Sequence, residues 1–341
     1  MSPITIDGSQ GEGGGQILRS SLALSLVTGK AFRIENIRAK RDKPGLLRQH
    51  YASARAAEQI SNAKTQGIEL KSTALEFAPG KIEAGNHSFV VGSAGSTALV
   101  LQTILPALAQ TSSESSIQIT GGTHNPMSPP FDFVRDTFAP VVSHCGWDIQ
   151  ATCNRYGFYP VGGGTVSYTI KKTNTNGPIN LLERGPLLFR EAYARVANIP
   201  FNIAEREIAY LREKLELSEE NAKARTIENA SGPGNFCMVQ LHFENIIETF
   251  IAYGRTGVSS ERVAEAAVKQ IKRYLKSNAP VGDYLADQLL LPICLGPGGS
   301  FRTTAITPHF ETNAKIIKQF LDVDISWERE DRLSWVVNIE N

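Results

Sequence analysis

One of the six histidines, His309, occupies a sequence context that suits chemistry. Pro308 restricts the backbone before it, and the residues ETNAKIIKQFL that follow predict a helix beginning at this point. Imidazole has an unperturbed pKa of about 6.5, so one ring nitrogen can act as a nucleophile near neutral pH. A lone histidine is ordinarily structural or solvated, and that reading stays open here. His309 is therefore a candidate nucleophile on its position alone.

Positive charge is concentrated in one segment. Residues 33–55 carry a net charge of +5, although the whole chain carries only +1. The segment connects an expected strand to an expected helix, where main-chain N–H groups also favour an anion. Such a run is equally typical of a solvated face. Because arginine forks and a glutamine suit a terminal phosphate, the segment is a candidate phosphate site. Its basic residues are Arg33, Arg38, Lys40, Arg41, Lys43, Arg48 and Arg55.

Two further segments place polar groups where a nucleotide could bind. The turn GEGGG at 11–15 lacks the Gly-Lys-Ser/Thr of a P-loop and matches GxGxxG poorly, so its glycines predict a tight strand-to-helix turn. Glu12 within it could still bind a divalent metal beside phosphates. In DYLADQ, Tyr284, Asp287 and Gln288 share one face of an expected helix. That face suits a purine, although an ordinary amphipathic helix would read the same way.

The expected secondary-structure elements that position these residues recur in the same order along the chain. A strand, a glycine turn and a helix ending at Gly29 open the chain, and a strand over 31–37 and a helix from Pro44 to about Ile60 follow. A strand, the turn 92–95 and a helix return next, and a third instance surrounds His309. We therefore expect an α/β fold of three repeated units. A smaller α/β domain over 183–277 is expected as an insert, dividing the large domain into 1–182 and 278–341.

Composition excludes several classes of protein. The chain has 341 residues, of which 41% are hydrophobic and 20% charged. This composition excludes a long disordered tail. Near-neutrality argues against wholesale coating of nucleic acid. The four cysteines show no zinc spacing, the N-terminus lacks the order of a signal peptide, and no apolar run could span a bilayer. We expect a cytoplasmic protein with reduced thiols and no membrane partner.

Eight segments considered together are more specific than any one of them. In chain order they are GEGGGQILRS, IRAKRDKPGLLRQH, GSAGSTALVLQTILPAL, GGTHNPMSPPFDF, GFYPVGGG, SGPGN, VGDYLADQL and PHFETNA. This series closely resembles the RNA 3′-terminal phosphate cyclases, and the resemblance covers essentially the whole chain. One departure is Tyr156, which stands where relatives commonly carry a basic residue.

The resemblance implies a fold and a reaction. The family's large domain repeats a unit of a four-stranded sheet with two helices, similar to the C-terminal domain of translation initiation factor three and shared with the enolpyruvyl transferases. Its enzymes use ATP and a divalent metal, Mg²⁺ or Mn²⁺, to convert an RNA 3′-phosphate to a 2′,3′-cyclic phosphate. The implied steps are a covalent histidine–AMP, transfer of AMP to the RNA 3′-phosphate, and attack by the neighbouring 2′-OH.

The resemblance also implies roles for named positions. His309 would carry AMP, and Glu12 would hold the metal or orient the histidine. The RNA terminal phosphate would be bound by Arg19, Arg38, Arg41 and Gln49. The adenylate pocket would comprise Gln102, Pro129, Phe133, Tyr284, Leu285, Ala286, Asp287 and Gln288, with Phe250 from the insert as a further wall.

Two rival functions follow from the same resemblance. Cyclase-like proteins of eukaryotic ribosome biogenesis share the fold, bind pre-rRNA and lack cyclase activity. The presence of His309 together with the arginines and Glu12 favours the enzyme, because the non-cyclising relatives lack this set. An enolpyruvyl transferase is the weaker rival, since it would leave the histidine and adenylate motifs without a role.

Overall fold

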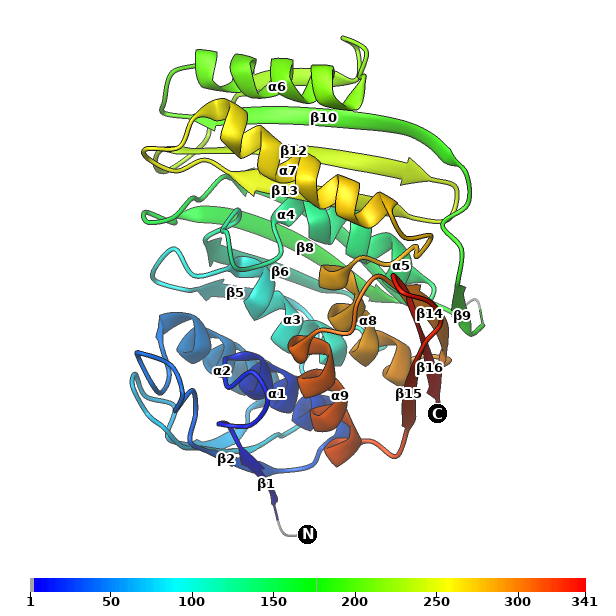
Figure 1. Ribbon diagram of the computed structural model, residues 1–341. Coiled ribbons are helices and arrows are strands. Elements are labelled where there is room, and N and C mark those ends of the chain that lie inside the picture. The colour runs from blue at the N-terminus through cyan, green and yellow to red at the C-terminus, as the bar shows by residue number, and fades with distance from the viewer. Residues whose placement is uncertain (1–2, 176) are drawn as a thin grey trace.

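Three units of the fold repeat one order of elements, strand–helix–strand–helix–strand–strand (Figure 1). The computed structural model describes residues 3–175 and 177–341. The first unit comprises β1 (Ile4–Asp7), α1 (Gln16–Thr28), β2 (Phe32–Glu35), α2 (Arg48–Ser61), β3 (Lys64–Gln66) and β4 (Leu75–Ala78). The second comprises β5 (Asn86–Val90), α3 (Thr97–Leu108), β6 (Ser115–Gly121), the run α4 (Phe131–Phe133), η1 (Val134–Phe138) and α5 (Ala139–Ser143), then β7 (Trp147–Arg155) and β8 (Gly164–Lys172).

The third unit is divided along the chain. It begins with β9 (Ile179–Leu181) and resumes with α8 (Asp283–Leu295), β14 (Gly299–Thr303), α9 (Pro308–Phe320), β15 (Asp324–Arg329) and β16 (Trp335–Glu340). The three sheets run β1-β2-β4-β3, β5-β6-β8-β7 and β9-β14-β16-β15, each with its first pair parallel and its other pairs antiparallel. The expected α/β fold of repeated sheet units is confirmed.

The chain between β9 and α8 forms a sheet of its own. It contains β10 (Leu187–Ala197), α6 (Asn202–Leu215), β11 (Ala222–Thr226), β12 (Gly234–Phe243), β13 (Ile247–Tyr253) and α7 (Ser260–Leu275). The sheet order is β11-β10-β12-β13, and it uses no strand from the repeated units. We refer to this part as the insert. The domain boundaries expected at 183 and 277 stay predictions.

The structure corrects where the third unit starts. The strand and helix around His309 are β14 and α9, which correspond to β2 and α2 of the first unit. The counterpart of α1 and α3 is α8, which the insert separates from β9 by about a hundred residues of sequence. Sequence pattern alone missed this correspondence because β9 has only three residues and the whole insert, in place of a short turn, lies between β9 and α8.

Local signals explain most helix ends. Gly29 caps α1 in the left-handed conformation with φ 71°, as its position predicts, and the Ser259 side chain accepts a hydrogen bond from the Arg262 N–H at the start of α7. The expected start of a helix at Pro44 is wrong, because α2 begins at Arg48. Gly45 has φ +76°, and a Cβ there would lie 2.3 Å from the Lys71 carbonyl oxygen, so the chain turns before the helix starts.

Helices of the repeated units meet inside the molecule. Helix α1 packs against α2, α3 and α9, and α8 packs against α9 (Figure 1). One core of buried apolar side chains runs through all three units and much of the insert. In the described part of the chain, no helix is both long and apolar enough to cross a membrane. The N-terminal halves of α1, α8 and α9 are thereby brought to one place.

Candidate active site

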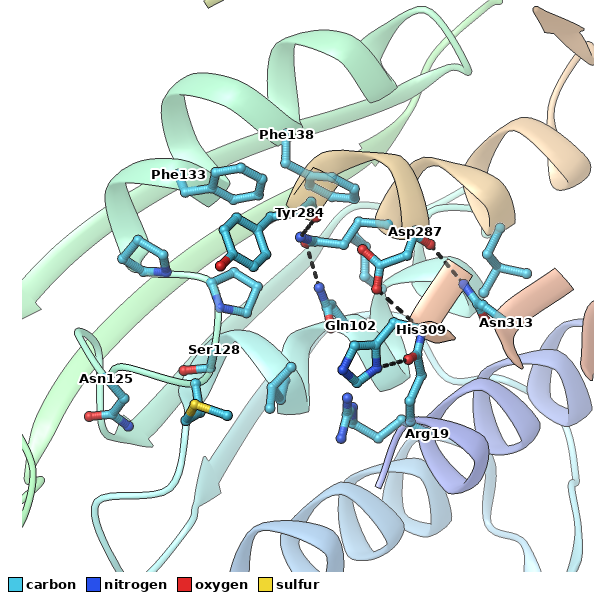
Figure 2. A pocket seen from close by; sticks show the side chains of 18 of the residues that line it. Arg19, Gln102, Asn125, Ser128, Phe133, Phe138, Tyr284, Asp287, His309 and Asn313 are labelled. Carbon is cyan, nitrogen blue, oxygen red and sulfur yellow. Dashed lines mark hydrogen bonds between the residues drawn. The ribbon is translucent and has the colours of Figure 1, made fainter. Parts of the chain in front are cut away.

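A cavity of about 490 Å³ lies where these helices meet (Figure 2). The three corresponding helices each supply polar residues to its wall: α1 gives Gln16 and Arg19, α3 gives Gln102, and α8 gives Asp287 among others. His309 comes from the first turn of α9. The loop 125–130 and strand β13 of the insert also contribute to the lining. The cavity therefore lies at the junction of all three units and the insert.

His309 is held by one ring nitrogen. Its Nδ1 lies 2.6 Å from Gln16 Oε1, and the Gln16 Nε2 amide donates to Asp287 Oδ2 over 3.3 Å. Because the amide nitrogen faces a carboxyl group, the amide oxygen faces the imidazole and accepts the Nδ1 proton. Figure 2 shows this hydrogen bond on one ring nitrogen of His309, and the other ring nitrogen, Nε2, is drawn without one. Side-chain exposure of 55% leaves His309 open to an incoming group.

Burial sets the electrostatics beneath the histidine. Desolvation raises the pKa of Asp287 to about 7, although the Arg19 charge and the Gln16 hydrogen bond oppose the shift. Desolvation likewise lowers the pKa of Arg19 to about 10, against the charges of Glu12 and Asp287, so Arg19 stays a cation at neutral pH. The Asn313 side chain donates to the Asp287 main-chain oxygen over 2.8 Å and so ties α9 to α8. The site therefore holds a fixed cation beside a carboxyl group that titrates near neutrality.

Glu12 presents an oxygen that has no protein partner. Its Oε1 is buried without a hydrogen bond and lies 4.0 Å from His309 Nδ1, while Oε2 pairs with Arg41 at 2.5 Å. Leaving a carboxylate oxygen buried and unpaired is costly, so the position fits a hard cation with oxygen ligands. Within 3–175 and 177–341, no three His, Cys, Asp or Glu side chains gather into a metal site. Glu12 alone would hold such a cation, with the remaining ligands supplied by phosphates and water.

Comparison with known proteins identifies the family. The model of the family described as RNA 3′-terminal phosphate cyclase matches residues 10–327. This chain belongs to that family. Three bacterial proteins named RNA 3′-terminal phosphate cyclase are similar to it. The protein of Koribacter versatilis is 46% identical over 98% of this chain and 95% of its own, and that of Ectopseudomonas mendocina is 44% identical over 94% of each. That of Pseudomonas fluorescens is 42% identical over 94% of this chain and 93% of its own.

A solved structure was also compared with this member of the cyclase family. The enolpyruvyl transferase NikO from Streptomyces tendae gives a TM-score of 0.34 and 11% identity over 99% of this chain and 48% of its own. A likeness at that level carries no argument about the function of this chain.

The structure gathers most of the residues expected for an adenylate pocket of the cyclase family. Gln102 donates to Gln288 Oε1 over 2.6 Å, which links α3 to α8 across the cavity. The ring of Tyr284 is 70% exposed at the mouth, near Phe133 (Figure 2). Asp287 lies beneath them, and Pro129 lines the adjoining loop.

Three expected pocket residues lie elsewhere. Phe250 does not line the cavity, although Thr249 and Ile251 on either side of it do. Successive strand side chains point to opposite faces, so Phe250 packs on Tyr274 of α7, with the ring centroids 5.3 Å apart. Leu285 and Ala286 are fully buried in the core, on the face of α8 turned away from the cavity. These three residues therefore do not line the cavity, and their expected role at the adenylate stays a prediction.

The four residues expected at the RNA phosphate of a cyclase are distributed over a wider surface. Arg19 lines the cavity. Arg38, at φ 56°, donates to the Gly45 main-chain oxygen over 3.1 Å, and Arg41 pairs with Glu12. Gln49 accepts the Ser96 N–H over 2.9 Å, which holds the turn 92–96 rather than facing the cavity. Arg19 and Arg41 thus stand at the site, and Arg38 and Gln49 shape the loop beside it.

Sequence reasoning missed several residues of the site. Gln16 follows the glycine turn directly, and that proximity was its only signal. His50 lies behind the glycine turn, and burial together with the charges of Arg19 and Arg38 lowers its pKa to about 3, so it stays neutral. Thr249 and Tyr253 reach the cavity only because the insert folds back onto the repeated units. No sequence pattern could predict this packing of the insert against the repeated units.

Proposed function

We propose that this protein converts the 3′-terminal phosphate of RNA to a 2′,3′-cyclic phosphate at the expense of ATP. The observation that carries the proposal is the hydrogen-bonded relay from His309 Nδ1 through Gln16 to Asp287, which leaves Nε2 available in a cavity large enough for a nucleotide. Its three bacterial relatives are named for the same activity, which supports the proposal.

The proposed reaction has three balanced steps. His309 Nε2 attacks the α-phosphorus of ATP, forming a phosphorus–nitrogen bond and releasing pyrophosphate. An oxygen of the RNA 3′-phosphate then attacks the same phosphorus, which frees the imidazole and gives an RNA(3′)pp(5′)A end. The ribose 2′-OH attacks the 3′-phosphate within the same nucleotide, closes the ring and expels AMP, and its proton is lost to solvent. Proximity within one ribose makes the last step effectively unimolecular.

The chain's own groups fit these steps. Arg19 places a desolvated cation beside His309, where negative charge develops on the attacked phosphate. Tyr284 and Phe133 offer aromatic faces to a base at the mouth of the cavity. A divalent cation, Mg²⁺ or Mn²⁺, held at Glu12 would neutralise phosphate charge. The binding-only rival, a pre-rRNA assembly factor, gives this arrangement no task.

The test is cyclisation of a 3′-phosphorylated oligoribonucleotide with ATP and Mg²⁺ or Mn²⁺. We expect wild-type protein to yield a 2′,3′-cyclic end that resists phosphatase. Failure to modify the RNA, combined with stable binding of it, would instead favour the assembly-factor rival.

Two arginine variants separate the RNA step from the ATP step. Arg38→Ala should raise KM for RNA about tenfold, the effect of losing one charge-assisted contact, and leave self-labelling by α-labelled ATP unchanged. Arg41→Ala should impair both steps, because Arg41 also holds Glu12 beside His309. Equal loss of both steps in Arg38→Ala would show that Arg38 is not dedicated to RNA.

A further inference from the structure

The turn between β7 and β8 displays apolar side chains from a firmly held backbone. The Gly162 N–H donates to the Phe158 carbonyl over 2.7 Å and closes the turn. Phe158 is buried, and its ring lies 6.3 Å from that of Phe236 on the insert. Tyr159, by contrast, is 73% exposed and Val161 is 50% exposed. Nothing in the proposed chemistry at His309 uses these two exposed side chains.

Glycines bring this turn against the second glycine-rich turn of the molecule. A Cβ on Gly162, which has φ +70°, would lie 2.7 Å from the Ser93 carbonyl oxygen and 2.8 Å from the Ala94 Cα. No side chain fits there, so the two backbones are in direct contact. The 158–163 turn is thereby fixed beside residues 92–96 and cannot swing freely.

The turn 92–96 is in its own right bound to the basic segment. Arg48 donates to the Gly92 carbonyl over 2.6 Å, and Gln49 accepts the Ser96 N–H over 2.9 Å. A continuous strip therefore runs over three segments, 38–49, 92–96 and 158–163. We refer to it as the strip. Cations lie at one end, close to His309 through Arg41 and Glu12, and an exposed aromatic ring lies at the other.

This order of groups matches single-stranded RNA. The phosphates of such a strand can pair with the cations. Its unstacked bases can stack on an aromatic ring, and this stacking does not depend on the base sequence. A duplex has no exposed base faces to stack on a single ring, and an acidic protein would use the cations and leave the ring without a role. In the proposed reaction the terminal phosphate lies at the cationic end of the strip. The nucleotides that precede it must extend away from His309, and the strip is a surface along which they can bind.

We propose that the RNA strand preceding the 3′-phosphate crosses residues 92–96 and stacks a base on Tyr159. This inference rests on the proposed cyclase function and adds a subsite for upstream nucleotides. Its consequence is length dependence: an RNA long enough to reach Tyr159 binds more tightly than one that ends before it.

The experiment compares two RNAs and four proteins. A dinucleotide and a ten-nucleotide RNA, each with a 3′-phosphate, are cyclised by wild type, Tyr159→Ala, Tyr159→Phe and Phe201→Ala. The last is the matched control, because Phe201 is an exposed aromatic residue (42%) adjoining α6 of the insert. Anisotropy of the labelled ten-nucleotide RNA measures binding independently of turnover.

Tyr159→Ala should raise KM and Kd for the ten-nucleotide RNA about tenfold, the loss of one stacked base. Its KM for the dinucleotide and its self-labelling by ATP should not change. Tyr159→Phe keeps the ring and should behave as wild type, as should Phe201→Ala. An unchanged KM and Kd for the longer RNA, or an equal loss for both lengths, would overturn the inference while leaving cyclisation intact. Absence of cyclisation by wild type would instead overturn the proposed function, and this inference with it.

Discussion

Two histidines in this molecule stand over aspartates, and they are built in opposite ways. His309 reaches Asp287 only through the Gln16 amide and is 55% exposed. His124 contacts Asp132 directly, with Nε2 2.7 Å from Oδ2, and both side chains are fully buried. The His124 ring is also stacked between Tyr156 and Phe236, with centroids 5.0 Å and 4.6 Å away. Both arrangements connect a histidine to an aspartate carboxyl group, yet of the two histidines only His309 lines the cavity.

The intervening amide accounts for the difference in chemistry. A direct carboxylate partner favours the charged imidazolium, which has no lone pair to offer, whereas an amide oxygen accepts a proton without adding a charge. Burial alone would raise the pKa of Asp132, but His124, Arg195 and Arg135 hold it below its usual range. Burial does raise the pKa of Asp287, to about 7. One histidine is buried in direct contact with its carboxyl group, and the other is exposed and reaches its carboxyl group only through an amide.

The largest expected difference between the two histidines appears when each imidazole ring is removed by substitution with alanine. His309→Ala should abolish self-labelling by α-labelled ATP, a loss of at least about 10⁴-fold, because the proposed phosphorus–nitrogen bond forms on the His309 ring. His124→Ala should keep labelling at saturating ATP. The measurement is acid-labile, protein-bound label after gel separation. Label that persists in His309→Ala would move the nucleophile elsewhere.

Stability should show the reverse order. His124→Ala leaves Asp132 buried and removes a ring from an aromatic stack, so the free energy of unfolding should fall by about 3–5 kcal/mol. His309→Ala should change it by less than about 0.5 kcal/mol, as should the control His144→Ala, since His144 is exposed. Urea denaturation of the three variants measures this. A small effect of His124→Ala would mean that the contact between His124 and Asp132 is not structural.

Asp287→Asn tests the carboxyl end of the relay through pH. The folded pKa of about 7 lies above the usual value of 3.8, so Asp287 supports stability below pH 4, and this support is lost as pH rises through 7. The variant should therefore lose about 4 kcal/mol less than wild type between pH 4 and 8. Urea denaturation across that range gives the slopes. Parallel slopes would show that Asp287 is already ionised in the folded state.

Much of the fold could be predicted from local pattern. Alternating strands and amphipathic helices with glycine or serine caps are short-range signals, and Gly29 caps the helix it was expected to end. Pro44 was misleading because a proline at an expected first turn says nothing of the tight packing at Gly45 that delays the helix. The division of the third unit was hidden, since pairing of β9 with β14 joins strands separated by the whole insert.

The candidate site, like the fold, has features that local sequence patterns predict and features that depend on tertiary packing. The basic segment, Glu12, His309 and the DYLADQ face are short sequence patterns, and side-chain chemistry together with the family resemblance selected them. Whether a side chain faces the cavity or the core was decided by tertiary packing. Phe250 turns away while Thr249 faces inward, a difference of one residue along β13 that depends on which face of the sheet the repeated units cover.

The sequence by itself indicated a candidate nucleophile at His309, a local excess of cations and three repeated units, because each is a pattern within a few tens of residues. Only the tertiary structure decided that Gln16 and Asp287 stand behind His309, 293 and 22 residues away along the chain. It also decided that His124 is buried against Asp132 although its residue type is the same. The physical reason is that burial and hydrogen-bond partners set the proton on an imidazole, and both are properties of the packed molecule.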